Sequence, residues 1–188
     1  MRAVLTDADG AGMRTPHLLA GSCASADPEA AFRHAELAIW DELVDSLARY
    51  PRPWRSAEEG AMVLGEEVDE LWDELRGNRI GCARAEAAQV GAMAVRFLAE
   101  VCEPGGAIRQ RCRDALAEQG RRRGEVGPRG RALASSHEGF GFLKREFDAL
   151  WCAVCSGESA RSAAQRVAAG AVRFIAEIGT APAGRLVR

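Results

Sequence analysis

Three carboxylates and one amide in the middle of the chain have a spacing that suits a metal site. Glu67 and Glu70 are three residues apart in a segment with helical periodicity, so they share one helix face. Glu86 and Gln89 repeat this spacing after a short turn at 76–82. A short turn favours antiparallel helices, which would bring Glu70 level with Glu86 and leave Gln89 level with Glu67. The four side chains therefore predict a site for Mg²⁺ or Mn²⁺, which prefer oxygen ligands.

The alternative interpretation is a solvated acidic helix face. A single Glu-x-x-Glu is a weak signal, because acidic residues are common on exposed helix surfaces. We assign to that surface Glu66, Asp69, Asp73 and Glu74. Glu67 and Glu70 differ, because they lie at the edge of the apolar stripe formed by Leu64, Val68, Leu71 and Leu75.

The segment that holds the acids is present twice. Residues 56–101 recur as residues 135–178, first 79 and later 77 positions on. Matched pairs include Ser56 and Ser135, Trp72 and Trp151, Arg96 and Arg173. An internal repeat of this length predicts two similar structural units in one chain.

Only the first copy keeps the acidic set. At the positions of Glu67, Glu70, Glu86 and Gln89, the second copy has Glu146, Ala149, Ala163 and Arg166. We therefore predict a metal site in the first copy and none in the second.

The elements that must position these residues are all helical. Apolar periodicity, caps and proline or glycine breaks predict helices at 28–50, 56–75, 83–102, 108–123, 136–155 and 162–177. No segment requires a strand, so we expect an all-α bundle of two three-helix repeats related by a pseudo-twofold axis. The expected domains are a flexible arm at 1–27, a first repeat at 28–106, a second at 107–179 and a tail at 180–188.

Composition excludes several classes of partner. The net charge of -2 gives no electrostatic reason to expect nucleic acid as the main partner, and no apolar run is long enough to cross a membrane. Asp7 and Asp9 stand where the apolar core of a secretory signal would lie. We expect a cytoplasmic protein with reduced thiols, and we expect Cys152 and Cys155 to be buried structural residues.

The acidic segment resembles a known family. Residues 66–72, Glu-Glu-Val-Asp-Glu-Leu-Trp, and residues 86–89, Glu-Ala-Ala-Gln, are similar to the signature of the MazG-like, all-α nucleoside triphosphate pyrophosphohydrolases. Residues 56–60 and 89–98 resemble a branch of that family found in phages and actinobacteria. The second copy keeps residues 136–139 at its front, and at its back it keeps residues 172–175.

This resemblance implies cleavage of a nucleotide between its α- and β-phosphates in the presence of Mg²⁺. It implies metal ligation by Glu67, Glu70 and Glu86, with Gln89 at a fourth position where the family usually has Asp. An amide oxygen can bind Mg²⁺, but it brings no charge. No residue is assigned as the general base, and the nucleotide is not specified.

Substrate-binding candidates near the turn are Arg79, Arg84 and Trp72. Trp72 could stack on a base, although its counterpart Trp151 argues equally for packing. Arg96 has a counterpart, Arg173, in the copy without ligands, which favours a structural role such as an ion pair between the repeats. The competing hypothesis for the whole chain is a non-catalytic helical scaffold that binds a protein partner. A homodimer remains open under either hypothesis.

Overall fold

The computed structural model describes residues 28–179, apart from 104, 123–124, 128 and 130. The arm predicted at 1–27 and the tail at 180–188 lie outside the described residues. Every regular element of the described part is a helix, and the prediction of an all-α protein is confirmed there. The elements are α1 (Pro28–Arg49), α2 (Ala57–Arg76), α3 (Ile80–Phe97), the π-helical turn η1 (Leu98–Cys102), α4 (Ile108–Arg122), α5 (Ser136–Cys155) and α6 (Arg161–Glu177).

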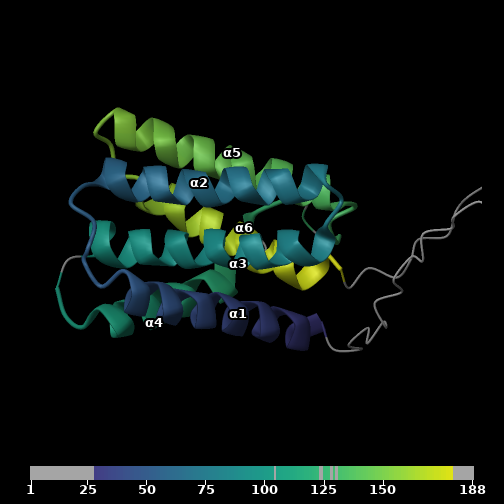
Figure 1. Cartoon of the computed structure of the whole chain (residues 1–188), viewed down its shortest axis with the longest axis horizontal. Coiled ribbons are helices and arrows are strands. Elements are labelled where there is room, and N and C mark those ends of the chain that lie inside the picture. Colours follow the sequence, from purple (N-terminus) through teal and green to yellow (C-terminus); the bar gives the residue numbers. More distant parts are fainter. Residues whose placement is uncertain (1–27, 104, 123–124, 128, 130, 180–188) are drawn as a thin grey trace, which may run out of the picture.

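The helices form three layers, and α3 and α6 make up the middle one (Figure 1). Helices α2 and α5 lie side by side over one face of this central pair, and α1 and α4 cover the opposite face. The residues at 90–97 of α3 and 167–176 of α6 are buried without interruption. Small side chains account for this burial, because alanine and glycine let neighbouring helices approach on every side.

Helices α2 and α5 begin with the same cap. The hydroxyl of Ser56 accepts a hydrogen bond from the backbone N–H of Glu59 at 3.2 Å, and the carboxylate of Glu59 accepts one from the N–H of Arg55 at 2.6 Å. At the start of α5, Ser135 and Glu138 cap the helix in the same way. Both caps have the Ser-x-x-Glu spacing of a capping box, with the glutamate accepting from the residue before the cap.

The turn between α2 and α3 is shorter than expected. Asn78 adopts a left-handed backbone conformation with φ of 53°, which Asn tolerates better than most residues. The chain reverses there, so α3 begins at Ile80 instead of residue 83. At its other end α3 continues directly into η1, which ends at Cys102, where the helix was predicted to end. The helix widens in η1, and Arg111 donates to the carbonyl oxygens of Ala99 and, at 2.5 Å, Glu103.

The prediction that Cys152 and Cys155 are buried is wrong. Both side chains are exposed on α5, whose buried stripe runs through Gly139, Leu143, Leu150 and Val154. Cys152 and Cys155 fall outside the phase of that stripe, so the helix turns them outward. Within the described residues, no helix combines the length and apolarity needed to cross a membrane.

Candidate functional site

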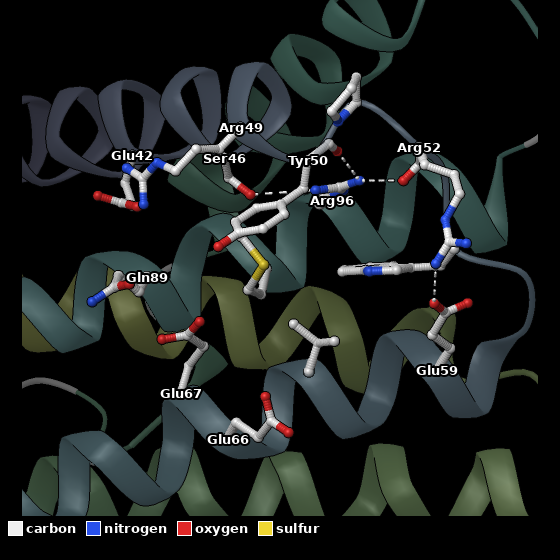
Figure 2. Close-up of a pocket in the computed structure, with 14 residues that line it drawn as sticks. Glu42, Ser46, Arg49, Tyr50, Arg52, Glu59, Glu66, Glu67, Gln89 and Arg96 are labelled. Atoms are coloured by element: carbon white, nitrogen blue, oxygen red, sulfur yellow. Dashed lines mark hydrogen bonds and ion pairs between the residues drawn. The ribbon is translucent and has the colours of Figure 1, made fainter.

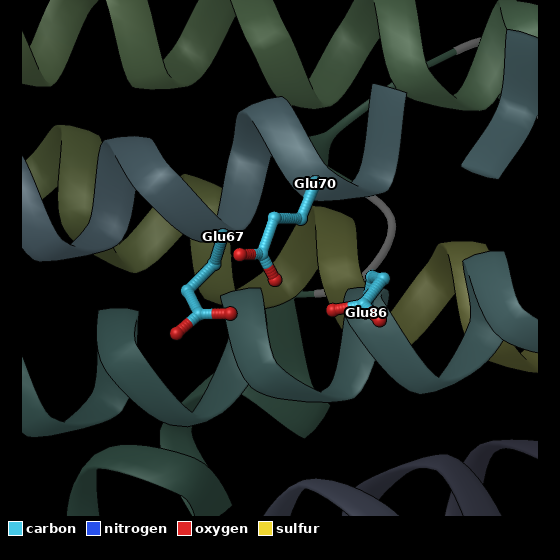
Figure 3. Close-up of side chains that lie close together, drawn as sticks. All are labelled: Glu67, Glu70 and Glu86. Carbon is cyan, nitrogen blue, oxygen red and sulfur yellow. The ribbon is translucent and has the colours of Figure 1, made fainter. Parts of the chain in front are cut away.

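Three carboxylates converge between α2 and α3 (Figure 3). Glu67 and Glu70 extend from α2 and Glu86 extends from α3, and one oxygen of each lies within 4.8 Å of the others. The short turn after Arg76 makes α2 and α3 antiparallel neighbours, which is what places Glu86 opposite the two acids of α2. The structure thus brings together three of the four predicted metal ligands.

The electrostatics of this cluster are unfavourable without a cation. Burial, followed by the neighbouring charges of Glu70 and Glu86, raises the pKa of Glu67 to about 7. The pKa of Glu86 is also raised, by burial first and then by Glu70. A buried carboxylate beside like charges resists ionisation unless a positive group compensates it.

One oxygen atom in the cluster is stranded. The Oε2 atom of Glu67 is buried and has no hydrogen-bond partner among the described residues. Buried polar atoms in proteins are almost always satisfied by protein, water or an ion. The carboxylates and this unsatisfied atom together fit a hard divalent cation.

Gln89 lies beside the cluster in an unexpected orientation. Its side-chain N–H donates a hydrogen bond to Oε2 of Glu86 at 2.7 Å. In this arrangement the amide of Gln89 orients the carboxylate of Glu86. It directs its N–H, and not its oxygen, at the acidic cluster. Glu86 is held in place, and the charge of the cluster is unchanged.

A cavity of about 610 Å³ opens next to the acids (Figure 2). Its wall is formed by the end of α1, the segment 50–55, α2 and α3. The residues that line it are Glu42, Ser46, Arg49, Tyr50, Pro51, Arg52, Trp54, Glu59, Val63, Glu66, Glu67, Gln89, Met93 and Arg96. Glu67 belongs to both the cluster and the cavity, so a ligand in the cavity can reach the acids.

The lining combines ring faces with charges of both signs. Tyr50 is 62% exposed, and Trp54 lies beneath the guanidinium of Arg96 at 5.0 Å from the ring centroid. Arg49 and Arg52 are exposed cations at the rim. The cavity was not predicted from the sequence. The available signal was the run of residues 50–54 before α2, in which Tyr50, Arg52 and Trp54 alternate with two prolines.

The three substrate-binding candidates lie outside this cavity. Arg79 is exposed and pairs with Glu74, with its Nε at 2.5 Å from Oε2. Arg84 is half-buried, and desolvation lowers its pKa. Trp72 packs against α5, stacked on Phe140 with ring centroids 4.9 Å apart. The structure therefore places all three away from the residues that line the cavity.

The second copy carries an ion pair at the corresponding position. Arg166 of α6 donates from Nε to Oε2 of Glu146 on α5 at 2.6 Å. Ala149 and Ala163 replace the other two acids. Within the described ranges, three metal-ligating side chains converge in the first copy, and no such set occurs in the second.

Comparison with known proteins yields no relative: no protein-family model, no curated protein and no solved structure matches the chain.

Proposed function

We propose that the chain is a Mg²⁺- or Mn²⁺-dependent nucleotide pyrophosphohydrolase with one site, in its first repeat. The reaction is nucleoside triphosphate plus water to nucleoside monophosphate plus pyrophosphate. The observation that carries the proposal is the meeting of Glu67, Glu70 and Glu86 beside a cavity of the size that small-molecule ligands occupy.

Glu67, Glu70 and Glu86 would hold the ion, and Gln89 would keep Glu86 in position through its N–H bond. A divalent ion bound there would lower the pKa of a water molecule and neutralise charge on the phosphates. Water would add to phosphorus as the bond to the oxygen bridging the α- and β-phosphates breaks, with the proton released to solvent.

The cavity would take the nucleoside. Tyr50 and Trp54 offer ring faces for stacking, and Met93 and Val63 add apolar surface. The exposed guanidiniums of Arg49 and Arg52 supply positive charge in a lining that is otherwise rich in carboxylates.

The second repeat would complete the architecture without chemistry of its own. In this proposal the two repeats form a pseudo-dimer of MazG-like units, and the second has lost its metal site. The pairing of Arg166 with Glu146 supports it, because a guanidinium there supplies the positive charge that a metal would supply in the first repeat.

The test is a product assay on the purified chain. A panel of ribo- and deoxyribonucleoside triphosphates is incubated with Mg²⁺ or Mn²⁺, and pyrophosphate and monophosphate are measured separately from orthophosphate and diphosphate. Equal amounts of pyrophosphate and monophosphate, abolished by Glu70→Ala and retained by Asp69→Ala, are expected. Absence of pyrophosphate with every nucleotide and both metals would remove the catalytic proposal.

One observation favours the second candidate, a non-catalytic scaffold that keeps the helical fold. Gln89 brings no charge and directs its N–H at Glu86, so the cluster has one carboxylate fewer than the family signature implies. If this candidate holds, Gln89→Asp creates no activity and Mn²⁺ binding is absent from the unmodified protein.

A further inference from the structure

The wall of the cavity includes a segment without regular secondary structure. Residues 50–55 connect α1 to α2 and contribute Tyr50, Arg52 and Trp54 to the lining. Two prolines in this segment, Pro51 and Pro53, have no backbone N–H to anchor it. The position of the wall therefore depends on contacts made to it from the rest of the molecule.

Arg96 of α3 makes several of these contacts (Figure 2). Its side chain is 2% exposed. Its Nη2 donates to the carbonyl oxygens of Tyr50 at 2.9 Å and Arg52 at 3.0 Å, and its Nη1 donates to the hydroxyl of Ser46 at 3.3 Å. One buried guanidinium thus joins the end of α1 to the segment that follows it.

Glu100 completes the arrangement. One oxygen accepts from Nε of Arg96 at 2.9 Å, and the other accepts from the backbone N–H of Trp54 at 3.0 Å. The Glu100 side chain is 5% exposed, so both members of the ion pair are shielded from water. Charge-assisted hydrogen bonds in such surroundings have fixed geometry and are stronger than bonds between neutral groups.

The ring of Trp54 packs closely against α2 at Gly60. A Cβ atom on Gly60 would lie 2.7 Å from Cε3 of Trp54, so only glycine leaves room for the ring there. The ring also lies 6.4 Å from that of Phe97, centroid to centroid. The backbone N–H of Trp54 is bound by Glu100, and its ring packs against Gly60 of α2 and Phe97 of α3. These contacts fix one side of the cavity.

We propose that Arg96 and Glu100 are positioning residues that hold the wall segment 50–55 in place and thereby set the affinity of the cavity for its ligand. The effect on affinity rests on the proposed function, whereas the holding of the segment does not. Neither residue needs to touch the reacting atoms.

The chain contains a matched control for this proposal. In the second copy, Arg173 donates from Nε to Glu177 at 2.7 Å, and its other nitrogens donate to the carbonyl oxygens of Val126 and Arg131. Glu177 accepts from the backbone N–H of Leu133 at 2.6 Å, as Glu100 does from Trp54. This second pair is built like the first, but neither of its members lines the 610 Å³ cavity.

The experiment compares Arg96→Met/Glu100→Gln with Arg173→Met/Glu177→Gln, each removing both charges so that no buried ion is left alone. Limited digestion with trypsin measures how firmly the wall is held, because the exposed Arg49 directly precedes it, the exposed Arg55 is its last residue, and Arg52 resists cleavage before Pro53. Circular dichroism establishes that both variants are folded. Kinetics with the best substrate of the panel give KM and kcat separately.

For the Arg96 variant we expect cleavage after Arg49 and Arg55 to accelerate about tenfold or more over the control variant, because local opening exposes the segment. We expect KM to rise by about tenfold with kcat changed less than about threefold, the pattern of lost binding without lost chemistry. Arg96→Lys, which keeps the positive charge, should show a smaller increase in both the cleavage rate and KM.

Equal cleavage of the two variants would overturn the proposal, whether or not the protein is an enzyme. Faster cleavage with an unchanged KM would overturn the link to affinity. If the unmodified chain has no activity, the proposed function fails, and the digestion alone decides whether Arg96 and Glu100 hold the segment.

Discussion

Arg166 and Glu146 form a direct ion pair between α6 and α5, with Nε and Oε2 separated by 2.6 Å. The equivalent residues of the first copy are Gln89 and Glu67, and there the glutamate faces two more carboxylates. Glu146 has the guanidinium of Arg166 beside it, whereas Glu67 has an oxygen without a hydrogen-bond partner among the described residues. This contrast within one chain is the strongest support for an ion at the first position.

Gln89→Arg should carry the ion pair of the second copy into the first. The guanidinium would neutralise part of the cluster, so the metal-free variant should be more stable than the unmodified protein at pH 8 by about 1 kcal/mol. For a chain of this length, that corresponds to a rise in Tm of about 2–4 °C. Calorimetry checks this, and added Mn²⁺ should no longer change Tm.

Gln89→Asp is the matched variant with the opposite charge. It should lower the metal-free Tm and increase the Tm gain produced by Mn²⁺. If Gln89→Arg left the response to Mn²⁺ intact, an ion at this cluster would be contradicted.

The stability of the metal-free protein should depend on the ionisation of Glu67. Its pKa is raised to about 7 in the folded state from 4.5, so the folded chain binds more protons between these values than the unfolded chain does. The contribution of Glu67 to stability is therefore greatest at low pH, falls as pH rises from about 5 to about 7, and is constant above that range. The difference in urea unfolding between the unmodified protein and Glu67→Gln isolates this contribution. A difference that is flat across this range would contradict the raised pKa.

Arg166→Gln should lower the free energy of unfolding without creating a metal site in the second copy. The substitution removes the partner of Glu146, and we expect a loss of about 1 kcal/mol because both side chains are partly exposed. Chemical unfolding measures the loss, and Mn²⁺ titration should show no additional site. A second equivalent of bound Mn²⁺ would show that one glutamate suffices, contrary to our account.

Gly91→Ala and Gly170→Ala should change stability in opposite directions. A Cβ on Gly91 would lie 2.5 Å from Cδ1 of Ile39, so alanine overfills the junction of α1 and α3 at a cost of about 1–3 kcal/mol. A Cβ on Gly170 meets its nearest atom at 3.4 Å, where alanine fits and gains about 0.5–1 kcal/mol of helix propensity. Urea midpoints check both, and equal effects would contradict the packing described between these helices.

The helices were predictable because their signals are local. The spacing of Ser56 and Glu59 fixed the start of α2, and the acids at 67, 70 and 86 were placed correctly on neighbouring helices by periodicity and a short turn. The direction of the side chain at Gln89 was not predictable, because it depends on a hydrogen bond to Glu86 one turn away.

The cavity and its wall could not be predicted, because they depend on contacts distant in sequence. Arg96 was expected to be structural, and its hydrogen bonds to Ser46, Tyr50 and Arg52 agree with that. Its partners differ from the expected ion pair between the repeats: it binds Glu100 in η1, four residues on, and the carbonyl oxygens of Tyr50 and Arg52. Only the folded chain brings residues 46 positions apart into contact.

Isothermal titration of the metal-free protein with Mn²⁺ at pH 7.5 tests the central claim most directly. One equivalent should bind, with proton release from the Glu67 cluster, and binding should be lost in Glu70→Ala and Glu86→Ala but kept in Asp69→Ala. Failure of the unmodified protein to bind Mn²⁺, or binding that persists unchanged in Glu70→Ala and Glu86→Ala, would contradict a metal site between α2 and α3.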